Sequence, residues 1–252
     1  MKRYLILMSL LMGLAIGTKA QGDAPYRKPL IVGLQGGINK SGIDDLGTTV
    51  FPETFFVNSK IEDRERKFAV TWGVFANYRF DDFEHLGIEV AVDYSKQTSG
   101  LLFSNTQKDF YYSMDFNYKY LNTNFLINFY PAVYDRGAAG FNVSLGFQIG
   151  SNVKDDIEYK SWGAGRSPAM GSDLEQQQQM MIVLKGRTLM RWIGGVGWEM
   201  ATFPMNFNFK IFKSLNDNDA VETLPNSYNF INNTNNSSTL LLTLGLYIGR
   251  NR

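Results

Sequence analysis

The residues that could carry chemistry are few. The chain contains one histidine, His85, and no cysteine, which excludes thiol catalysis, disulfide bonds and cysteine-ligated zinc. Glu89 and Asp93 could form a carboxylate pair, because residues four apart face the same side of a β-strand. They would then lie roughly 13 Å apart along the strand, whereas glycosidase carboxylates lie about 5 to 9.5 Å apart. We therefore predict that this pair is not catalytic.

The position of His85 argues against nucleophilic catalysis. A histidine that activates a serine must lie within hydrogen-bond distance of the serine hydroxyl. His85 falls in the short segment Asp81–Leu86, between two stretches of alternating apolar residues, where a turn residue at the surface is expected. We predict no catalytic residue, no cofactor and no metal site, and a chain that is not an enzyme.

The beginning of the chain predicts export. Lys2 and Arg3 precede the apolar run Tyr4–Ile16, and Thr18-Lys19-Ala20 places small residues where a signal peptidase cleaves. The apolar run is too short for a helix that crosses a bilayer, which needs roughly 20 residues. We predict a signal peptide at residues 1–20 and one mature domain at residues 21–252.

The composition of the chain restricts its partners. The net charge is +1, and it falls by three, to −2, when Lys2, Arg3 and Lys19 are removed. A nearly neutral chain gives no electrostatic reason to bind nucleic acid. Aromatic residues make up 14% of the chain and accompany 24 glycines, with no long apolar run after residue 20. This composition is typical of a transmembrane β-barrel, in which only alternate residues face lipid.

Alternation of apolar and polar residues predicts the strands, because successive side chains of a strand point to opposite faces. In residues 68–80, for example, Phe68, Val70 and Trp72 alternate with smaller and more polar residues. The fourth stretch changes phase near Tyr120, which predicts a β-bulge there. Eight stretches follow this pattern: residues 30–39, 68–80, 88–95, 116–129, 141–150, 187–200, 206–211 and 240–249.

The connections between these stretches alternate in length. Short links are expected after the second, fourth and sixth strands, at Asp81–Leu86, Ala132–Ala139 and Thr202–Pro204. Long polar links are expected after the first, fifth and seventh strands, roughly at residues 41–66, 154–180 and 216–236, and an intermediate link after the third. Outer-membrane barrels combine short periplasmic turns with longer extracellular loops.

The composition of the two faces indicates which one meets lipid. The polar face holds mainly small residues and amides, whereas the outside of a soluble barrel carries many more lysines and glutamates. The charged residues on the polar face predict an interior ionic network of Arg79, Glu89, Asp93, Arg187, Arg191, Glu199 and Lys210. Aromatic residues at strand ends predict two girdles at the headgroup layers, formed by Tyr78, Phe80, Phe129, Trp198 and Phe207 at one rim and Tyr94, Tyr118, Tyr120 and Trp192 at the other.

We therefore predict an all-β fold, a closed antiparallel transmembrane β-barrel of about eight strands in the outer membrane. An eight-stranded barrel encloses little beyond its own side chains, so the leading hypothesis is a non-enzymatic barrel that presents long extracellular loops, alone or as an accessory subunit of an envelope complex. Its expected partners are outer-membrane lipid, lipopolysaccharide and other envelope proteins. The alternative is a narrow porin-like channel for small solutes, and the third hypothesis is a lipid-modifying enzyme.

Several strand segments also resemble a known family. Gly33-Leu34-Gln35-Gly36-Gly37-Ile38-Asn39 resembles the first strand of small outer-membrane β-barrel proteins of the porin family, also called PorT-like. Residues 73–78 with 86–90, residues 120–131 and residues 141–150 are similar to later strands of that family. The resemblance covers nearly the whole predicted mature chain and implies the barrel fold. For function it implies, more loosely, assistance to type IX protein secretion.

Overall fold

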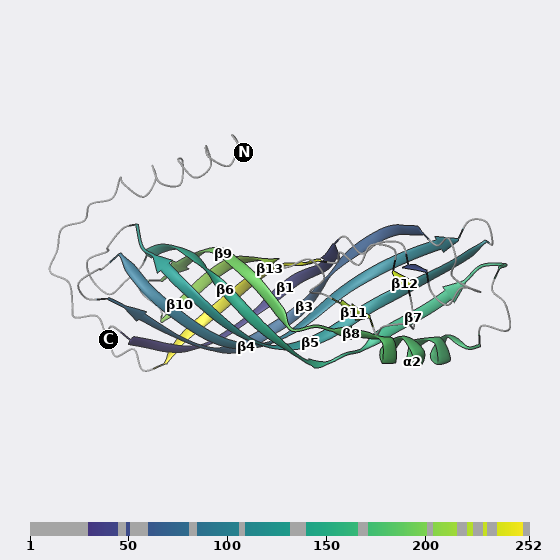
Figure 1. Cartoon of the computed structure of the whole chain (residues 1–252). Coiled ribbons are helices and arrows are strands. Elements are labelled where there is room, and N and C mark those ends of the chain that lie inside the picture. Colours follow the sequence, from purple (N-terminus) through teal and green to yellow (C-terminus); the bar gives the residue numbers. More distant parts are fainter. Residues whose placement is uncertain are drawn as a thin grey trace, which may run out of the picture.

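Eight antiparallel strands close into a ring in which each strand pairs with the strand on either side (Figure 1). This computed structural model describes residues 30–44, 49–50, 60–80, 85–105, 109–131, 140–165, 171–200, 204–215, 221–223, 229–230 and 236–248. The predicted fold class, a closed antiparallel β-barrel of about eight strands, is confirmed. The predicted signal peptide at residues 1–20 lies outside the described residues.

Pairing of the first and last strands closes the ring. Val32 lies opposite Ile248 and Asp44 lies opposite Asn236, so neither strand leaves an open edge. Around the barrel the strands are β1 (Leu30–Asp44), β3 (Lys60–Arg79), β4 (Leu86–Asn105), β5 (Phe110–Phe129), β6 (Gly140–Lys154), β9 (Leu189–Glu199), β10 (Met205–Ser214) and β13 (Asn236–Ile248).

The barrel is apolar outside and polar inside. Outward side chains are large and exposed, with Leu145 at 63%, Trp72 at 62% and Ile127 at 60%. Inward side chains are buried and mostly carry amides, hydroxyls or charges, among them Gln35, Asn39, Asn77, Asn122, Asn124, Asn128, Asn142, Gln148, Asn206 and Asn208. A barrel in water would have the reverse arrangement.

The two ends of the barrel differ. At one end, called the turn end below, β3 is joined to β4, β5 to β6 and β9 to β10, and β1 begins and β13 ends there. At the opposite end, the extension end, β3, β4 and β5 are each 20 residues long and project beyond the other strands (Figure 1). β7 (Ile157–Trp162) pairs with this part of β5, from Tyr111–Trp162 to Phe116–Ile157, and completes a four-stranded sheet called the extension.

The extension corrects the prediction of long loops. Parts of residues 41–66 belong to β1 and β3, and residues 154–180 contain β7 and part of the helix α2 (Asp173–Val183). The intermediate link expected after the third strand is mainly strand, since β4 runs to Asn105 and β5 starts at Phe110. Short strands β2 (Thr49–Val50), β8 (Leu184–Gly186), β11 (Val221–Thr223) and β12 (Asn229–Phe230) form two further small sheets.

The extension has a hydrophobic core of its own. Phe103 of β4 stacks on Tyr112 of β5 with 4.6 Å between ring centroids, and both are fully buried. This apolar cluster comprises Ile43, Leu101, Phe103, Phe110, Tyr112, Met114, Phe116, Tyr118, Tyr120, Ile157, Tyr159 and Leu189. Burial of this much apolar surface makes the extension a packed part of the fold.

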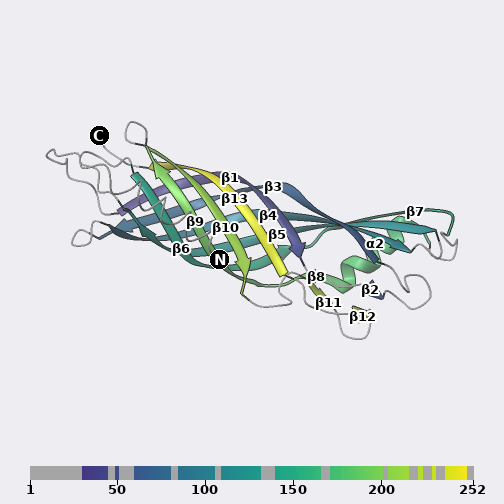
Figure 2. The same cartoon turned by 90° about the horizontal axis from the view of Figure 1, so that it is seen from above.

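The helix α2 covers the free edge of β7, as the view from above shows (Figure 2). Its first turn is capped reciprocally, because the Ser172 hydroxyl accepts the Glu175 N–H and the Glu175 carboxylate accepts the Ser172 N–H. The Asp173 carboxylate accepts bonds from the N–H and hydroxyl of Ser161, and the Gln177 side chain accepts the Tyr159 N–H. These bonds occupy N–H groups that an edge strand would otherwise offer to another chain.

The bulge predicted near Tyr120 lies in the neighbouring strand. β5 keeps one phase throughout, with its even-numbered side chains buried from Phe110 to Asn128. The register between β5 and β6 shifts by one residue between the pairs Lys119–Lys154 and Tyr120–Asn152. The additional residue is therefore Val153 of β6. The apolar residues that suggested a phase change in β5 face the core of the extension instead of lipid.

Candidate functional site

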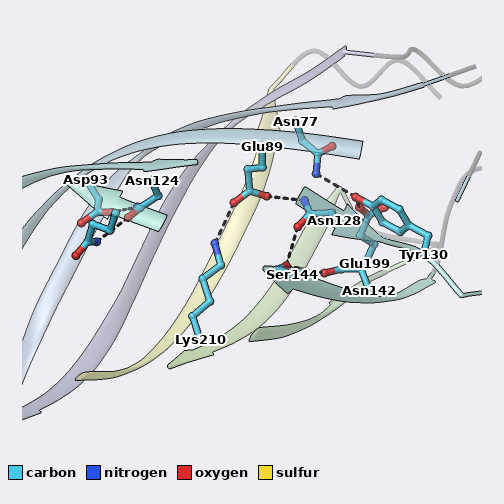
Figure 3. A network of polar contacts seen from close by, with 11 residues as sticks. Asn77, Glu89, Asp93, Asn124, Asn128, Tyr130, Asn142, Ser144, Glu199 and Lys210 are labelled. Carbon is cyan, nitrogen blue, oxygen red and sulfur yellow. Dashed lines mark hydrogen bonds and ion pairs between the residues drawn. The ribbon is translucent and has the colours of Figure 1, made fainter. Parts of the chain in front are cut away.

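An ion pair crosses the lumen near the middle of the barrel. The Lys210 ammonium lies 2.9 Å from the Glu89 carboxylate, and both side chains are buried. The other Glu89 oxygen accepts a 3.3 Å hydrogen bond from the Asn128 amide, whose own oxygen accepts the Ser144 hydroxyl at 2.7 Å (Figure 3). Lys210 lies on β10 and Glu89 on β4, which are four strands apart in either direction around the ring.

A second ion pair crosses the lumen nearer the turn end. Arg79 of β3 lies 3.4 Å from the buried Glu199 carboxylate of β9, and these strands are again four apart. The Arg79 guanidinium also lies over the Tyr130 ring, 3.4 Å from its centroid. The Tyr130 hydroxyl donates to Glu199 at 3.3 Å and accepts from the Asn77 amide at 3.0 Å.

Amides hold the remaining buried charges. The Asn122 amide donates to Asp93 at 2.7 Å, and the Asn124 amide donates to its other oxygen (Figure 3). The Gln148 amide donates to Asn124 at 2.6 Å, and its oxygen accepts from Arg191 Nε at 2.9 Å. Arg191 also donates to Thr239 at 2.9 Å. Hydrogen bonds thus lead from Asp93 to the guanidinium of Arg191.

The structure brings six of the seven predicted network residues into the lumen. Arg79, Glu89, Asp93, Arg191, Glu199 and Lys210 are buried or half-buried there, in the groups just described. Arg187 was wrongly predicted, since it is exposed and lies in the segment between β8 and β9. Alternation cannot show that the barrel wall begins two residues later, at Leu189.

The lumen ends in a small cavity at the extension end. Ser41, Gln97, Tyr118, Leu189 and Ser237 are among the residues that line it. It has room for about one water molecule. The Tyr118 hydroxyl is buried without a hydrogen-bond partner in the described part of the chain.

Most predicted girdle residues lie on the outer surface. Tyr78, Phe80, Phe129, Trp198 and Phe207 are exposed near the turn end, and Trp192 is exposed towards the extension end. Tyr94 is half-buried there and contacts Trp72, with 5.6 Å between ring centroids. Their placement fits two bands of amphipathic rings around an apolar belt.

Two of the predicted girdle residues are placed elsewhere. Tyr118 and Tyr120 are buried, at 4% and 1% exposed, inside the barrel mouth and the core of the extension. The girdle prediction is wrong for both, because β5 has no phase change and its even-numbered side chains all point inward. Both tyrosines lie in a strand, as expected of aromatic residues, but their side chains fill the interior.

A row of lysines at the extension end was missed by the sequence reasoning. Lys96 of β4 lies directly opposite Lys119 of β5, and Lys119 lies directly opposite Lys154 of β6. Lys67, farther up β3, differs because it lies 2.6 Å from Asp115. Burial lowers the pKa of Lys67, but the hydrogen bond and charge of Asp115, with Glu65, give a net rise. The sequence does contain a signal for this row, because a lysine stands two residues after the outward Tyr94 in β4 and two residues before the outward Leu121 in β5.

The chain is similar to several solved structures at low sequence identity. No protein-family model and no curated protein sequence matches the chain. It is similar to the outer-membrane protein OprG of Pseudomonas aeruginosa, with 14% identity, a TM-score of 0.48 and coverage of 90% of this chain and 96% of that one. Ail, the attachment invasion locus protein of Yersinia pestis, solved with the heparin analogue sucrose octasulfate, is 10% identical, with a TM-score of 0.39 and coverage of 88% of this chain and 100% of that one. Neisserial surface protein A is 8% identical, with a TM-score of 0.31 and coverage of 86% of this chain and 97% of that one.

His85 lies at the turn end, as predicted. It follows β3 and precedes β4, and its Nδ1 lies 2.7 Å from the Tyr130 carbonyl oxygen.

No group of three or more histidine, cysteine, aspartate or glutamate side chains in the described residues could hold a metal ion. Within the same residues, no helix is both long and apolar enough to cross a bilayer.

Proposed function

We propose that the chain is a non-enzymatic integral protein of the outer membrane, and that its barrel holds the extension outside the bilayer. The observation that carries this proposal is the exposed apolar belt around a polar, hydrogen-bonded interior. In hydrocarbon, an unpaired backbone N–H or C=O costs several kcal/mol, and the pairing of β1 with β13 leaves no such edge. The turn end then faces the periplasm and the extension faces outward.

The extension supports a role in presenting a protein surface. Its core and the capped edge of β7 give it a fixed shape. Flexible loops, in contrast, would lose conformational freedom when a partner binds, which lowers affinity. Its outer surface carries exposed charges of both signs, including Glu62, Arg64 and Arg66 of β3. We therefore propose that it serves as an accessory subunit of a larger envelope complex. Assistance to type IX secretion is the specific form of this proposal, and it rests on the resemblance of the strand segments alone.

A filled lumen supports structure over transport. Two ion pairs join strands on opposite sides of the ring, so side chains cross the space through which a solute would pass. A narrow channel is the second candidate, favoured by the cavity beside Tyr118 that has room for about one water molecule. A measurement of ion conductance through the barrel distinguishes the structural role from the narrow channel.

The proposal against enzymatic activity rests on the site of the only histidine. His85 lies at the turn end and bonds the Tyr130 carbonyl, on the periplasmic side of the proposed orientation. A lipid-modifying residue would have to reach the outer leaflet from the extension end.

The test of the proposed function is purification of the tagged full-length protein from its native outer membrane in mild detergent, followed by mass spectrometry. Stoichiometric recovery with other envelope proteins is expected, and loss of those partners on deletion of the segment from β7 to α2 would identify the extension as the docking surface. Recovery of the barrel alone would contradict the subunit role. Recovery of the protein in the soluble periplasm would contradict the membrane assignment.

A further inference from the structure

Three lysines form a row across neighbouring strands on the outside of the barrel. In antiparallel sheets, directly opposite residues have their side chains on the same face, with Cβ atoms about 5 Å apart. The pairs Lys96–Lys119 and Lys119–Lys154 place all three side chains on one face of β4, β5 and β6. This is the outer face, since Val92 and Leu121, each an even number of residues away, are exposed.

The bulge in β6 completes the row. Without an additional residue, Val153 would lie opposite Lys119 and Lys154 would point to the other face. The register shift moves Lys154 into the position opposite Lys119. Bulges commonly redirect a side chain in this way, so an irregularity of the backbone here produces three adjacent positive charges.

The row makes no ion pair within the described part of the chain. Like charges directly opposite each other destabilise a sheet. The nearby acid Asp115 is occupied by Lys67 at 2.6 Å, and Asp155 accepts the Gly186 N–H at 3.0 Å. Asp156, beside Lys154, is half-buried. An external anion would remove the repulsion between the three ammonium groups.

The row lies at the boundary of the apolar belt. Along β4, Lys96 is the next outward residue after Tyr94, which packs against Trp72. Along β5, Lys119 is the outward residue immediately before the exposed Leu121. Aromatic rings mark the headgroup layer of a bilayer, and lysine side chains extend from apolar surface towards polar headgroups. The three ammonium groups are therefore at the level of lipid phosphates.

We propose that Lys96, Lys119 and Lys154 bind the phosphate groups of a phosphorylated glycolipid of the outer leaflet, lipopolysaccharide. This inference rests on the proposed function, because it requires the barrel to lie in an outer membrane. A lipid is favoured over free phosphate because the row adjoins exposed apolar side chains, Leu121 at 49% and Val153 at 59%. Acyl chains can lie on this surface while the phosphates pair with the lysines.

The experiment compares lipid binding to the full-length protein and its variants, purified in mild detergent, by native mass spectrometry. The probes are bisphosphorylated lipid A, the same lipid after removal of its phosphates, and inorganic phosphate. The test variant is Lys96→Gln with Lys119→Gln and Lys154→Gln. A charge-matched control replaces the exposed Lys160, Lys185 and Arg187 by glutamine, and a second control replaces the three row lysines by arginine.

The expected result is that bisphosphorylated lipid A binds the wild type at least about tenfold more tightly than the dephosphorylated lipid, and that the glutamine row variant loses at least about tenfold. The arginine variant and the charge-matched control should bind as the wild type does. Equal binding by the glutamine row variant and the control would overturn the proposal. Inorganic phosphate binding as tightly as lipid A would also overturn it, in favour of a free-anion site.

Folding and location are measured for each variant. A heat-dependent shift in gel mobility reports a folded barrel, and the single variant Lys119→Gln, expected to bind lipid A more weakly than the wild type, replaces the triple variant if the latter does not fold. If the protein fractionates with the outer membrane but binds lipid A equally well with and without its phosphates, this inference is overturned and the proposed function is not. Fractionation of the wild type with the soluble periplasm would overturn the proposed function as well.

Discussion

The Lys210 ammonium lies 2.9 Å from the Glu89 carboxylate, across the barrel from strand β10 to strand β4. Arg79 and Glu199 make a second such contact between β3 and β9. Both pairs join opposite sides of the ring, so they obstruct passage through the lumen as well as neutralise the buried charges. These two contacts connect the sequence pattern, in which the charges lie on the polar face, to a barrel closed by its own side chains.

Replacing Lys210 by methionine should lower the free energy of unfolding by about 3 kcal/mol, because Glu89 is left buried without its cation. The measurement is urea unfolding of the barrel in detergent, followed by tryptophan fluorescence. The double variant Glu89→Gln/Lys210→Met should recover most of the loss, since no uncompensated charge remains. A single variant as stable as the wild type would show that the pair does not form in the folded barrel.

Wild-type protein in planar bilayers should give no steady conductance, because the two cross-lumen pairs and the amides around Asp93 and Asn128 fill the interior. Removing both cross-lumen pairs, by Glu89→Ala with Lys210→Ala and Arg79→Ala with Glu199→Ala, should introduce a small steady current. Leu145→Ala, on the outer surface, is the matched control and should remain silent. Steady wild-type current would favour the narrow channel.

An arginine in place of Leu145 should lower the free energy of unfolding in lipid vesicles by about 2 to 4 kcal/mol, the cost of a charge on the lipid-facing surface of a barrel. Leu145 is 63% exposed, in the outer belt of β6. Ser113→Arg, on the outer face of the extension, should lower the free energy of unfolding by no more than about 1 kcal/mol, the cost of a like-charge pair with the opposite Lys160. Equal, small effects at both positions would indicate that water surrounds the barrel.

The tyrosines Tyr118 and Tyr130 should respond in opposite directions to removal of the hydroxyl. Tyr118→Phe should raise the free energy of unfolding by about 1 kcal/mol, because its buried hydroxyl has no partner in the described part of the chain. Tyr130→Phe should lower it by about 1 to 2 kcal/mol, since its hydroxyl bonds Asn77 and Glu199. Urea unfolding of the two variants side by side measures both. A loss of stability in Tyr118→Phe would mean that a water or ligand satisfies that hydroxyl.

Alternation predicted much of the barrel because its physical cause is local. Successive side chains of a strand must face lipid or lumen in turn, so Val92 and Asp93 could be assigned to opposite faces from their order alone. The two ion pairs could be expected as a set of buried charges of both signs. Their specific partners could not, because they depend on which strands lie four apart in the closed ring.

Elsewhere the same pattern misled, for identifiable reasons. Tyr118 and Tyr120 are apolar enough for the outer surface, but they pack inside because the extension has a core of its own. The loop predicted at residues 154–180 contains β7 and part of α2, which alternation could not separate from solvated loop. Lys154 reaches the outer row only through the additional residue Val153, and a bulge in one strand is visible only against the register of its neighbour.

The most direct test of the central claim is cysteine labelling on intact cells, which the chain permits because it contains no cysteine. Three single variants cover the three environments: Lys160→Cys in the extension, Leu145→Cys in the apolar belt and His85→Cys at the turn end. All three positions are exposed in the isolated protein. The probe is a maleimide that does not cross membranes.

A barrel in the outer membrane with its extension outside predicts labelling of Lys160→Cys on intact cells and of His85→Cys only after the outer membrane is permeabilised. Leu145→Cys should remain unlabelled in both conditions and react only after unfolding, because lipid covers it. Labelling of Leu145→Cys as soon as the outer membrane is opened would place that surface in water and contradict the account. Labelling of His85→Cys but not Lys160→Cys on intact cells would reverse the proposed orientation.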